Sequence, residues 1–163
     1  MSLQKGNDFE TLKKLHAESN MAAEKNILER AIGHAKDESS IEQALTFALS
    51  DQVRNCDQLY ILSEVAVNSD EGLLGVWSLI KDRLEFLKEN FGGQFQLSGF
   101  FKTVLSQFSQ QSLIDEAKTY FRENPVENST MAINQGLESA QLNVQWYSRD
   151  GDQIKQKLEN YAH

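Results

Sequence analysis

The sequence predicts an all-α protein built from stacked antiparallel helix pairs. Apolar residues recur at intervals of three and four along nearly the whole chain, which is the period of a helix and not of a strand. Pro125 is the single proline among 163 residues, so little interrupts helices. Links of only a few residues force consecutive helices to run antiparallel. We therefore expect four helix pairs, each of roughly 30 to 40 residues, in a HEAT/armadillo-like α-solenoid.

Two helices are expected before residue 36. The first lies near residues 8–18 and buries Phe9, Leu12 and Leu15. The second follows Asn20, a residue type that caps helix N-termini, and ends close to Gly33. Its apolar stripe comprises Met21, Ile27, Leu28, Ala31, Ile32 and Ala35.

The clearest amphipathic pattern belongs to the next helix. Its apolar residues have offsets of 0, 3, 4, 7 and 8, which place them on one helical stripe. They are Ile41, Ala44, Leu45, Ala48 and Leu49. Ser39 or Ser40 is positioned to cap this helix, and Asp57 is the expected N-cap of a short helix that ends around Asn68. The apolar residues of that short helix are Leu59, Leu62, Val65 and Ala66.

A longer helix runs from about Leu73 to Leu87 and should end before Gly92-Gly93. Each glycine costs about 1 kcal/mol relative to alanine in a helix interior, so this pair is the best internal break. Pro125 should close the pair that follows, because proline supplies no backbone donor. The remaining helices are expected at residues 97–108, 113–121, 129–148 and 150–161.

Composition limits the classes of partner. No apolar run approaches the roughly 18 to 20 residues that span a bilayer, so no membrane span is expected. The net charge of -8 disfavours nucleic acid, because phosphate binding relies on clustered Lys and Arg. Cys56 is the single cysteine, which suits a reducing compartment. Residues 1–7 are expected to be linker or cloning residues that precede a single domain at residues 8–163.

No catalytic residue, metal site or cofactor is expected in this chain. A zinc hydrolase needs two histidines at i and i+4 with a glutamate between them, and His16, His34 and His163 do not fit that spacing. Each histidine is instead expected at the surface or at a helix end. Several acidic residues are expected mainly on outer faces: Glu10, Glu18, Glu24, Glu29 and Glu38. Cys56 has no histidine nearby in sequence to activate it.

Several segments, in fixed order, resemble the C-terminal helical domain of the zinc aminopeptidases, a family that includes puromycin-sensitive aminopeptidase and aminopeptidase N. The resemblance covers residues 12–162, and its main segments are residues 21–31, 44–54, 75–81 and 142–150. Val53-Arg54 with Asp57 resembles the Val-Arg-x-Gln-Asp turn of the family, although Cys56 stands where glutamine is usual. Gly99 replaces an arginine of many puromycin-sensitive relatives, whereas residues 93–98 are closer to aminopeptidase N. Both subfamilies stay open.

The resemblance implies the noncatalytic C-terminal part of a longer chain, which covers an active-site cavity and helps to accommodate peptide substrates. Zinc, its ligands and the removal of N-terminal amino acids would belong to the missing upstream catalytic domain, the partner of this one. Arg54 could meet a carboxylate or carbonyl of the substrate, or pair with Asp57 to fix the turn. Gln94 and Phe95 are further cavity candidates, and Phe95 lies outside the apolar stripe of its helix.

Two other interpretations remain. A freestanding helical-repeat scaffold could bind a partner protein along its concave face. An independent enzyme would need a site of unrecognised spacing. The puromycin-sensitive type implies the cytoplasm, which we favour, and the aminopeptidase N type implies the extracellular face of the plasma membrane.

Overall fold

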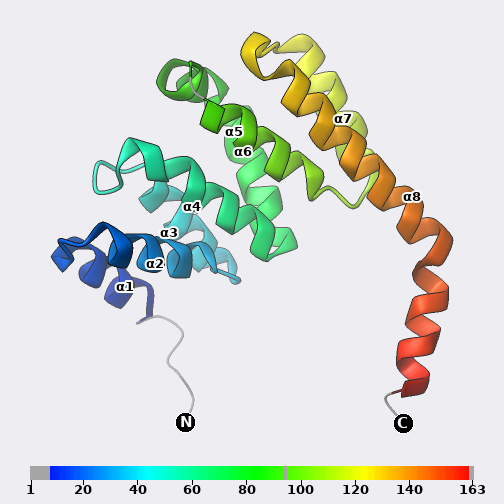
Figure 1. The fold of residues 1–163 in the computed structure, drawn as a ribbon, viewed down its shortest axis with the longest axis horizontal. Helices are drawn as coiled ribbons and strands as arrows, with labels where there is room; N and C mark the ends of the chain where they lie inside the picture. Colours follow the sequence, from blue (N-terminus) through cyan, green and yellow to red (C-terminus); the bar gives the residue numbers. More distant parts are fainter. Residues whose placement is uncertain (1–7, 94, 162–163) are drawn as a thin grey trace. The chain divides into compact units, whose positions relative to one another are not determined.

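A computed structural model describes residues 8–93 and 95–161 of the chain. All regular secondary structure in these residues is helical, which confirms the all-α prediction (Figure 1). The chain divides into two compact units, Met1–Phe100 and Phe101–His163, and their boundary falls inside one helix. Each unit has its own core.

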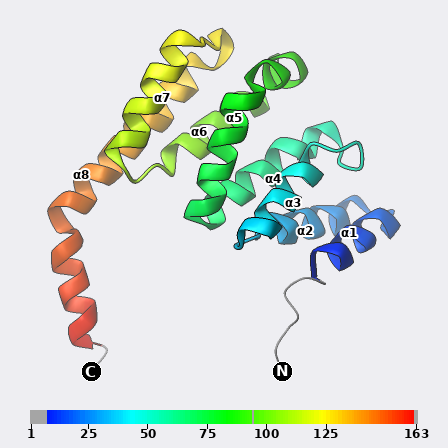
Figure 2. The same cartoon turned by 180° about the vertical axis from the view of Figure 1, so that it is seen from behind.

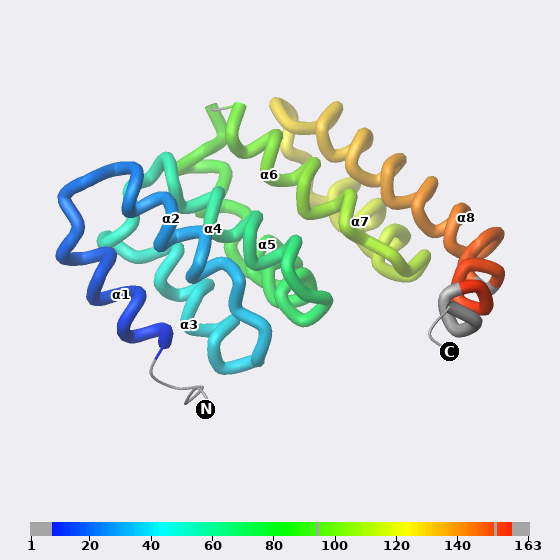
Figure 3. Tube along the Cα trace, turned by 60° about the horizontal axis from the view of Figure 1, so that its bottom comes forward, coloured from blue at the N-terminus to red at the C-terminus, as the bar shows by residue number. Residues whose placement is uncertain are grey.

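The first unit contains five complete helices and the start of a sixth. They are α1 (Asp8–Glu18), α2 (Ala22–Gly33), α3 (Glu38–Ala48), α4 (Asn55–Asn68), α5 (Asp70–Phe91) and α6 (Phe95–Ser106). Sequence neighbours pack together, as α1 does on α2 and α3 on α4. Helices two apart also pack, α2 against α4 and α3 against α5, so these four helices form two layers (Figure 3).

In the first unit, α4 packs against α2, α3 and α5 and contributes many of the buried apolar residues. The α4 stripe predicted from the sequence is confirmed, because Leu59, Leu62, Val65 and Ala66 are all buried. Gly33 lets α2 approach α4 closely: a Cβ added there would lie 2.4 Å from the Cβ of Glu64. Only glycine therefore fits this point of the seam without a shift of one helix.

The second unit holds the rest of α6, α7 (Gln111–Glu123), the 3₁₀ turn η1 (Glu127–Ser129) and α8 (Thr130–Tyr161), as Figure 2 shows. Phe101 packs edge-on against Phe121, with ring centroids 5.4 Å apart. The α7 and α8 helices are also joined by two amide hydrogen bonds between Gln111 and Gln141, at 2.7 and 3.2 Å. The apolar residues at helical spacing in the ranges predicted for α6 and α7 are buried, apart from Leu113, which is half-buried. The buried ones are Leu97, Phe100, Phe101, Val104, Leu105, Phe108, Ile114, Ala117 and Phe121.

The prediction of two helices at residues 129–148 and 150–161 is wrong, because α8 is one helix of 32 residues. The expected junction, at residue 149, has no proline, and Gly151 lies two residues beyond it. One glycine costs about 1 kcal/mol in a helix interior, which is too little to stop a long helix. Gly92-Gly93 does end α5, and the Gly92 amide donates to the Lys88 carbonyl at 2.8 Å.

The predicted N-caps also need correction. Met21, not Asn20, occupies the cap position of α2 and gives no side-chain cap. Asp37 caps α3 by accepting from the Ser40 amide at 3.1 Å, so Ser39 and Ser40 lie in the first turn. Asp37 lies two residues before Ser39, and its carboxylate already caps the first turn, so neither serine acts as the cap.

The α4 helix starts two residues earlier than its predicted cap. Arg54 holds the cap position and Asp57 lies inside the first turn. A carboxylate is stabilised there by the exposed amides of the helix N-terminus, so Asp57 supports this end of the helix without being its cap.

The apolar stripes predicted for α1 and α2 are only partly correct. Ile32 is buried, but Leu15, Met21 and Ile27 are exposed. The two helices instead bury a polar pair, His16 and Glu29. Glu29 is therefore not on an outer face, and His16 lies at a helix end, in the last turn of α1, but not at the surface. Periodicity of apolar residues cannot reveal a helix face whose buried position is polar.

Candidate functional site

Arg54, the first cavity candidate, lies at the start of α4. Its Nε donates to Asp57 Oδ2 at 2.5 Å, and its Nη2 donates to Asn26 Oδ1 on α2 at 3.4 Å. The hydrogen bond and charge of Asp57 raise the pKa of the Arg54 guanidinium above its ordinary value. The pair with Asp57 therefore fixes the turn, as one of the two sequence interpretations requires. The Arg54 side chain is 49% exposed, so it remains accessible to a ligand.

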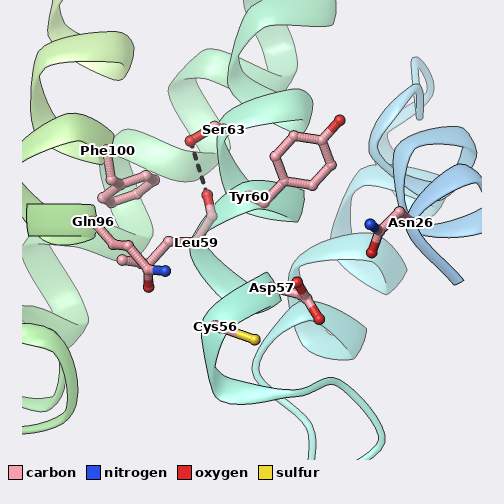
Figure 4. A pocket seen from close by; sticks show the side chains of 8 residues that line it. All are labelled: Asn26, Cys56, Asp57, Leu59, Tyr60, Ser63, Gln96 and Phe100. Carbon is pink, nitrogen blue, oxygen red and sulfur yellow. Dashed lines mark hydrogen bonds between the residues drawn. The ribbon is translucent and has the colours of Figure 1, made fainter. Parts of the chain in front are cut away.

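Next to this turn lies a hollow of about 510 Å³ (Figure 4). Helix α4 forms its middle, and α2 and α6 each contribute from one side. Its lining residues are Asn26, Cys56, Asp57, Leu59, Tyr60, Ser63, Gln96 and Phe100. Leu59 and Phe100 are buried apolar residues, whereas Asn26, Cys56, Tyr60 and Gln96 are exposed. The hollow thus combines an apolar base with polar groups that solvent can reach.

Tyr60 lies beside a group of charged residues on the α2–α4 seam. Partial burial, and to a smaller extent the carboxylate of Glu64, raises the pKa of the Tyr60 hydroxyl. Glu64 Oε2 lies 3.8 Å from Arg30 Nε and 3.7 Å from His34 Nε2. Both acidic residues near the hollow, Glu64 and Asp57, therefore have cationic or ionisable partners close by.

Phe95, another sequence candidate, lies outside this hollow. Phe95 is 97% exposed in the first turn of α6 and does not line the hollow, although its neighbour Gln96 does. Gln94 lies outside the described residues. The structure therefore places Arg54 in contact with two lining residues of the hollow, Asn26 and Asp57, and places Phe95 on the exposed surface of α6.

Sequence reasoning missed Asn26, Tyr60 and Gln96 as lining residues. Asn26 shares an α2 face with Arg30 and His34, at offsets of four and eight residues, and that polar stripe could have been noticed. No local signal joins Gln96 to Asn26, because 70 positions separate them in the sequence. Only the packing of helices brings the two carboxamides to one hollow.

The residues present do not fit a zinc site. In the described part of the chain, no group of three or more His, Cys, Asp or Glu side chains could hold a metal ion. His16 Nε2 and Glu29 Oε1 lie 2.8 Å apart, and both side chains are almost fully buried. The His16 ring also packs edge-on against the Phe47 ring. The His16 and Glu29 side chains bind each other, and among the described residues they do not belong to a group of three that could hold a metal ion. Across the described ranges, no helix combines the length and apolarity needed to cross a bilayer.

Comparisons with known proteins place the chain in a family. The model of the ERAP1-like C-terminal domain matches residues 2–142. Aminopeptidase M1 of Arabidopsis thaliana is 27% identical over 138 residues, which are 85% of this chain and 15% of that protein. Aminopeptidase 2, mitochondrial, of Saccharomyces cerevisiae is 24% identical over 152 residues, or 93% of this chain and 16% of that protein. Aminopeptidase N of Mus musculus is 24% identical over 132 residues, 78% and 14% of the two chains.

These matches agree with the resemblance seen in the sequence. The chain spans only 14 to 16% of the length of these curated relatives. The family match covers most of the chain, with the hollow between α2, α4 and α6 inside the matched range. On this basis the chain belongs to the ERAP1-like C-terminal domain family.

Proposed function

We propose that this chain is the noncatalytic C-terminal helical domain of a zinc aminopeptidase, which covers the active-site cavity and helps to accommodate peptide substrates. The family match over residues 2–142, with relatives that are named aminopeptidases, carries the proposal. Removal of N-terminal amino acids is assigned to the catalytic domain of the same parent chain. Zinc is assigned to that domain too, because the residues described here offer no set of ligands for it.

We also propose a HEAT/armadillo-like α-solenoid. The packing of α2 on α4 and of α3 on α5 supports it, since stacked helix pairs bring together helices two apart in sequence. Within this arrangement α2 and α4 carry Asn26, Arg54 and Tyr60 on one accessible face. Such a face is suited to contact the part of a peptide that lies far from the cleaved bond.

Arg54 is the side chain that we assign to substrate, with Phe95 as a weaker contact. Asp57 holds the guanidinium in place, and half of its surface stays open, so a carboxylate or carbonyl of a peptide can still approach its donors. For the parent protein we favour the cytoplasm, where the exposed thiol of Cys56 would stay reduced. The extracellular face of the plasma membrane is the alternative.

The test uses the full-length parent protein and a series of unblocked peptides of increasing length. We expect Arg54→Ala to raise KM for the long peptides, with kcat and the shortest substrate little changed, because a contact far from the reacting bond contributes uniform binding. A parent that releases no N-terminal amino acid from any peptide would overturn the proposal. In that case a freestanding scaffold, whose polar hollow binds a partner protein, becomes the better account.

A further inference from the structure

The hollow between α2, α4 and α6 presents polar groups whose charges are largely paired. Asp57 binds Arg54, and Glu64, beside Tyr60, lies within 4 Å of Arg30 and His34. A site lined by charges of one sign concentrates ions of the other sign, but paired charges produce little such field. The hollow is therefore better suited to a polar, uncharged ligand than to an ion.

Two carboxamides lie on either side of α4 in this hollow, Asn26 from α2 and Gln96 from α6 (Figure 4). A carboxamide offers both an N–H donor and a carbonyl acceptor, so it can pair with the N–H and C=O groups of a peptide main chain. The Gln96 side chain forms no hydrogen bond within the described part of the chain, and the Asn26 side chain accepts only the 3.4 Å bond from Arg54. Donors on both amides are thus open to a ligand.

The apolar surface of the hollow between Asn26 and Gln96 is suited to a peptide that crosses α4. Leu59 and Phe100 provide buried apolar surface, and the ring of Tyr60 is 42% exposed beside them. The Ser63 hydroxyl donates to the Leu59 carbonyl at 2.8 Å and leaves its own oxygen as an acceptor. A volume of about 510 Å³ lies within the range of about 300–1,000 Å³ that is usual for binding sites.

We propose that this hollow binds the main chain of an extended peptide, with Asn26 and Gln96 pairing with peptide groups and Tyr60 packing between them. This deepens the proposed function and rests on it, since the peptide would be the distal part of an aminopeptidase substrate. Hydrogen bonds to the peptide main chain do not depend on the side chains of the peptide. The hollow consequently accepts peptides of varied sequence, and it acts separately from a carboxylate contact at Arg54.

Cys56 gives a direct readout, because it lines the hollow and is the single cysteine of the chain. The probe is an eight-residue peptide of alternating alanine and serine, acetylated and amidated so that it has no terminal charge. Eight extended residues reach about 26 Å, more than the width of two helices. We expect this peptide to slow the alkylation of Cys56 by iodoacetamide, about twofold when its concentration equals its dissociation constant. Mass spectrometry over time gives the rate.

Two comparisons make this test specific. The same peptide with N-methylated alternate peptide bonds should protect Cys56 at least fivefold less well, because it lacks the required donors. Gln96→Ala should raise the half-protecting peptide concentration by about five- to tenfold. Gln145→Ala removes an exposed carboxamide from α8, outside the hollow, and should leave protection unchanged. Circular dichroism of both variants verifies that they are folded.

Unchanged alkylation in the presence of the peptide would overturn the proposal, and so would equal protection by the N-methylated peptide or full protection of Gln96→Ala. These outcomes are separable from failure of the proposed function. If the parent protein cleaves N-terminal residues but Cys56 is not protected, only the assignment of the hollow fails. If Cys56 is protected but the parent has no aminopeptidase activity, peptide binding stands and the enzyme assignment fails.

Discussion

Two hydrogen-bonded pairs of ionisable side chains have similar geometry but different surroundings. His16 and Glu29 lie 2.8 Å apart with almost no exposed surface, whereas Arg54 and Asp57 lie 2.5 Å apart with side chains that are 49% and 17% exposed. The buried pair has almost no surface that a ligand could reach, and its hydrogen bond joins α1 to α2. The accessible pair fixes a turn and still faces solvent. Burial, more than residue type, separates a structural pair from a candidate contact.

The largest expected effect comes from breaking the buried pair. Glu29→Ala would leave His16 without its partner in an apolar site beside Phe47, where removal of one partner of a buried pair costs about 3–5 kcal/mol. Urea unfolding followed by circular dichroism measures the loss in free energy of unfolding. Replacing both residues with apolar ones, His16→Leu with Glu29→Met, should recover most of it. A loss below about 1 kcal/mol for Glu29→Ala would show that the pair contributes no more than a surface pair does.

A smaller effect on stability is expected at Gly33, where α2 packs closely against α4. Gly33→Ala places a Cβ 2.4 Å from the Cβ of Glu64, and such overpacking costs about 1–3 kcal/mol. Gly99→Ala is the matched control, because nothing lies within 4 Å of its added Cβ in α6. That substitution should stabilise the chain by about 0.5–1 kcal/mol. If the thermal unfolding midpoint shifts by the same amount and in the same direction for both variants, close packing at Gly33 does not set the stability of the α2–α4 contact.

The smallest effect on stability is expected at Arg54. An exposed ion pair contributes about 0–1 kcal/mol, so Arg54→Ala should barely change the urea midpoint of this chain. Added salt should weaken the Arg54–Asp57 pair further and leave the buried pair nearly unaffected, because screening acts mainly on exposed charges. Unfolding at low and high ionic strength measures both. A destabilisation at Arg54 as large as that at Glu29 would remove the distinction between the two pairs.

The sequence predicted most of the helices, because their evidence is local. The stripe of α4 and the end of α5 at Gly92 were both correct, since they depend on apolar spacing and on the cost of glycine. The continuous α8 was missed because a break into two helices was expected near residue 149, although no proline stands there and the single glycine nearby, Gly151, does not stop a helix that is otherwise favourable.

The candidate site could be predicted only in part. Arg54 and its pairing with Asp57 were found from a short motif, and the structure shows that bond. Asn26 and Gln96 were not found, because their proximity depends on how three helices pack and not on any spacing in the sequence. His16 and Glu29 were misplaced for a similar reason: a buried polar pair looks like two surface residues until its partner is known.

We infer that this chain is the C-terminal helical domain of a zinc aminopeptidase. Reading the full-length transcript upstream of residue 1 tests it most directly. The account predicts an in-frame HExxH motif followed by a second zinc-ligating glutamate, which together supply the metal site that the residues described here do not fit. A natural start codon at the beginning of this segment would contradict the claim, and so would an upstream region without that motif.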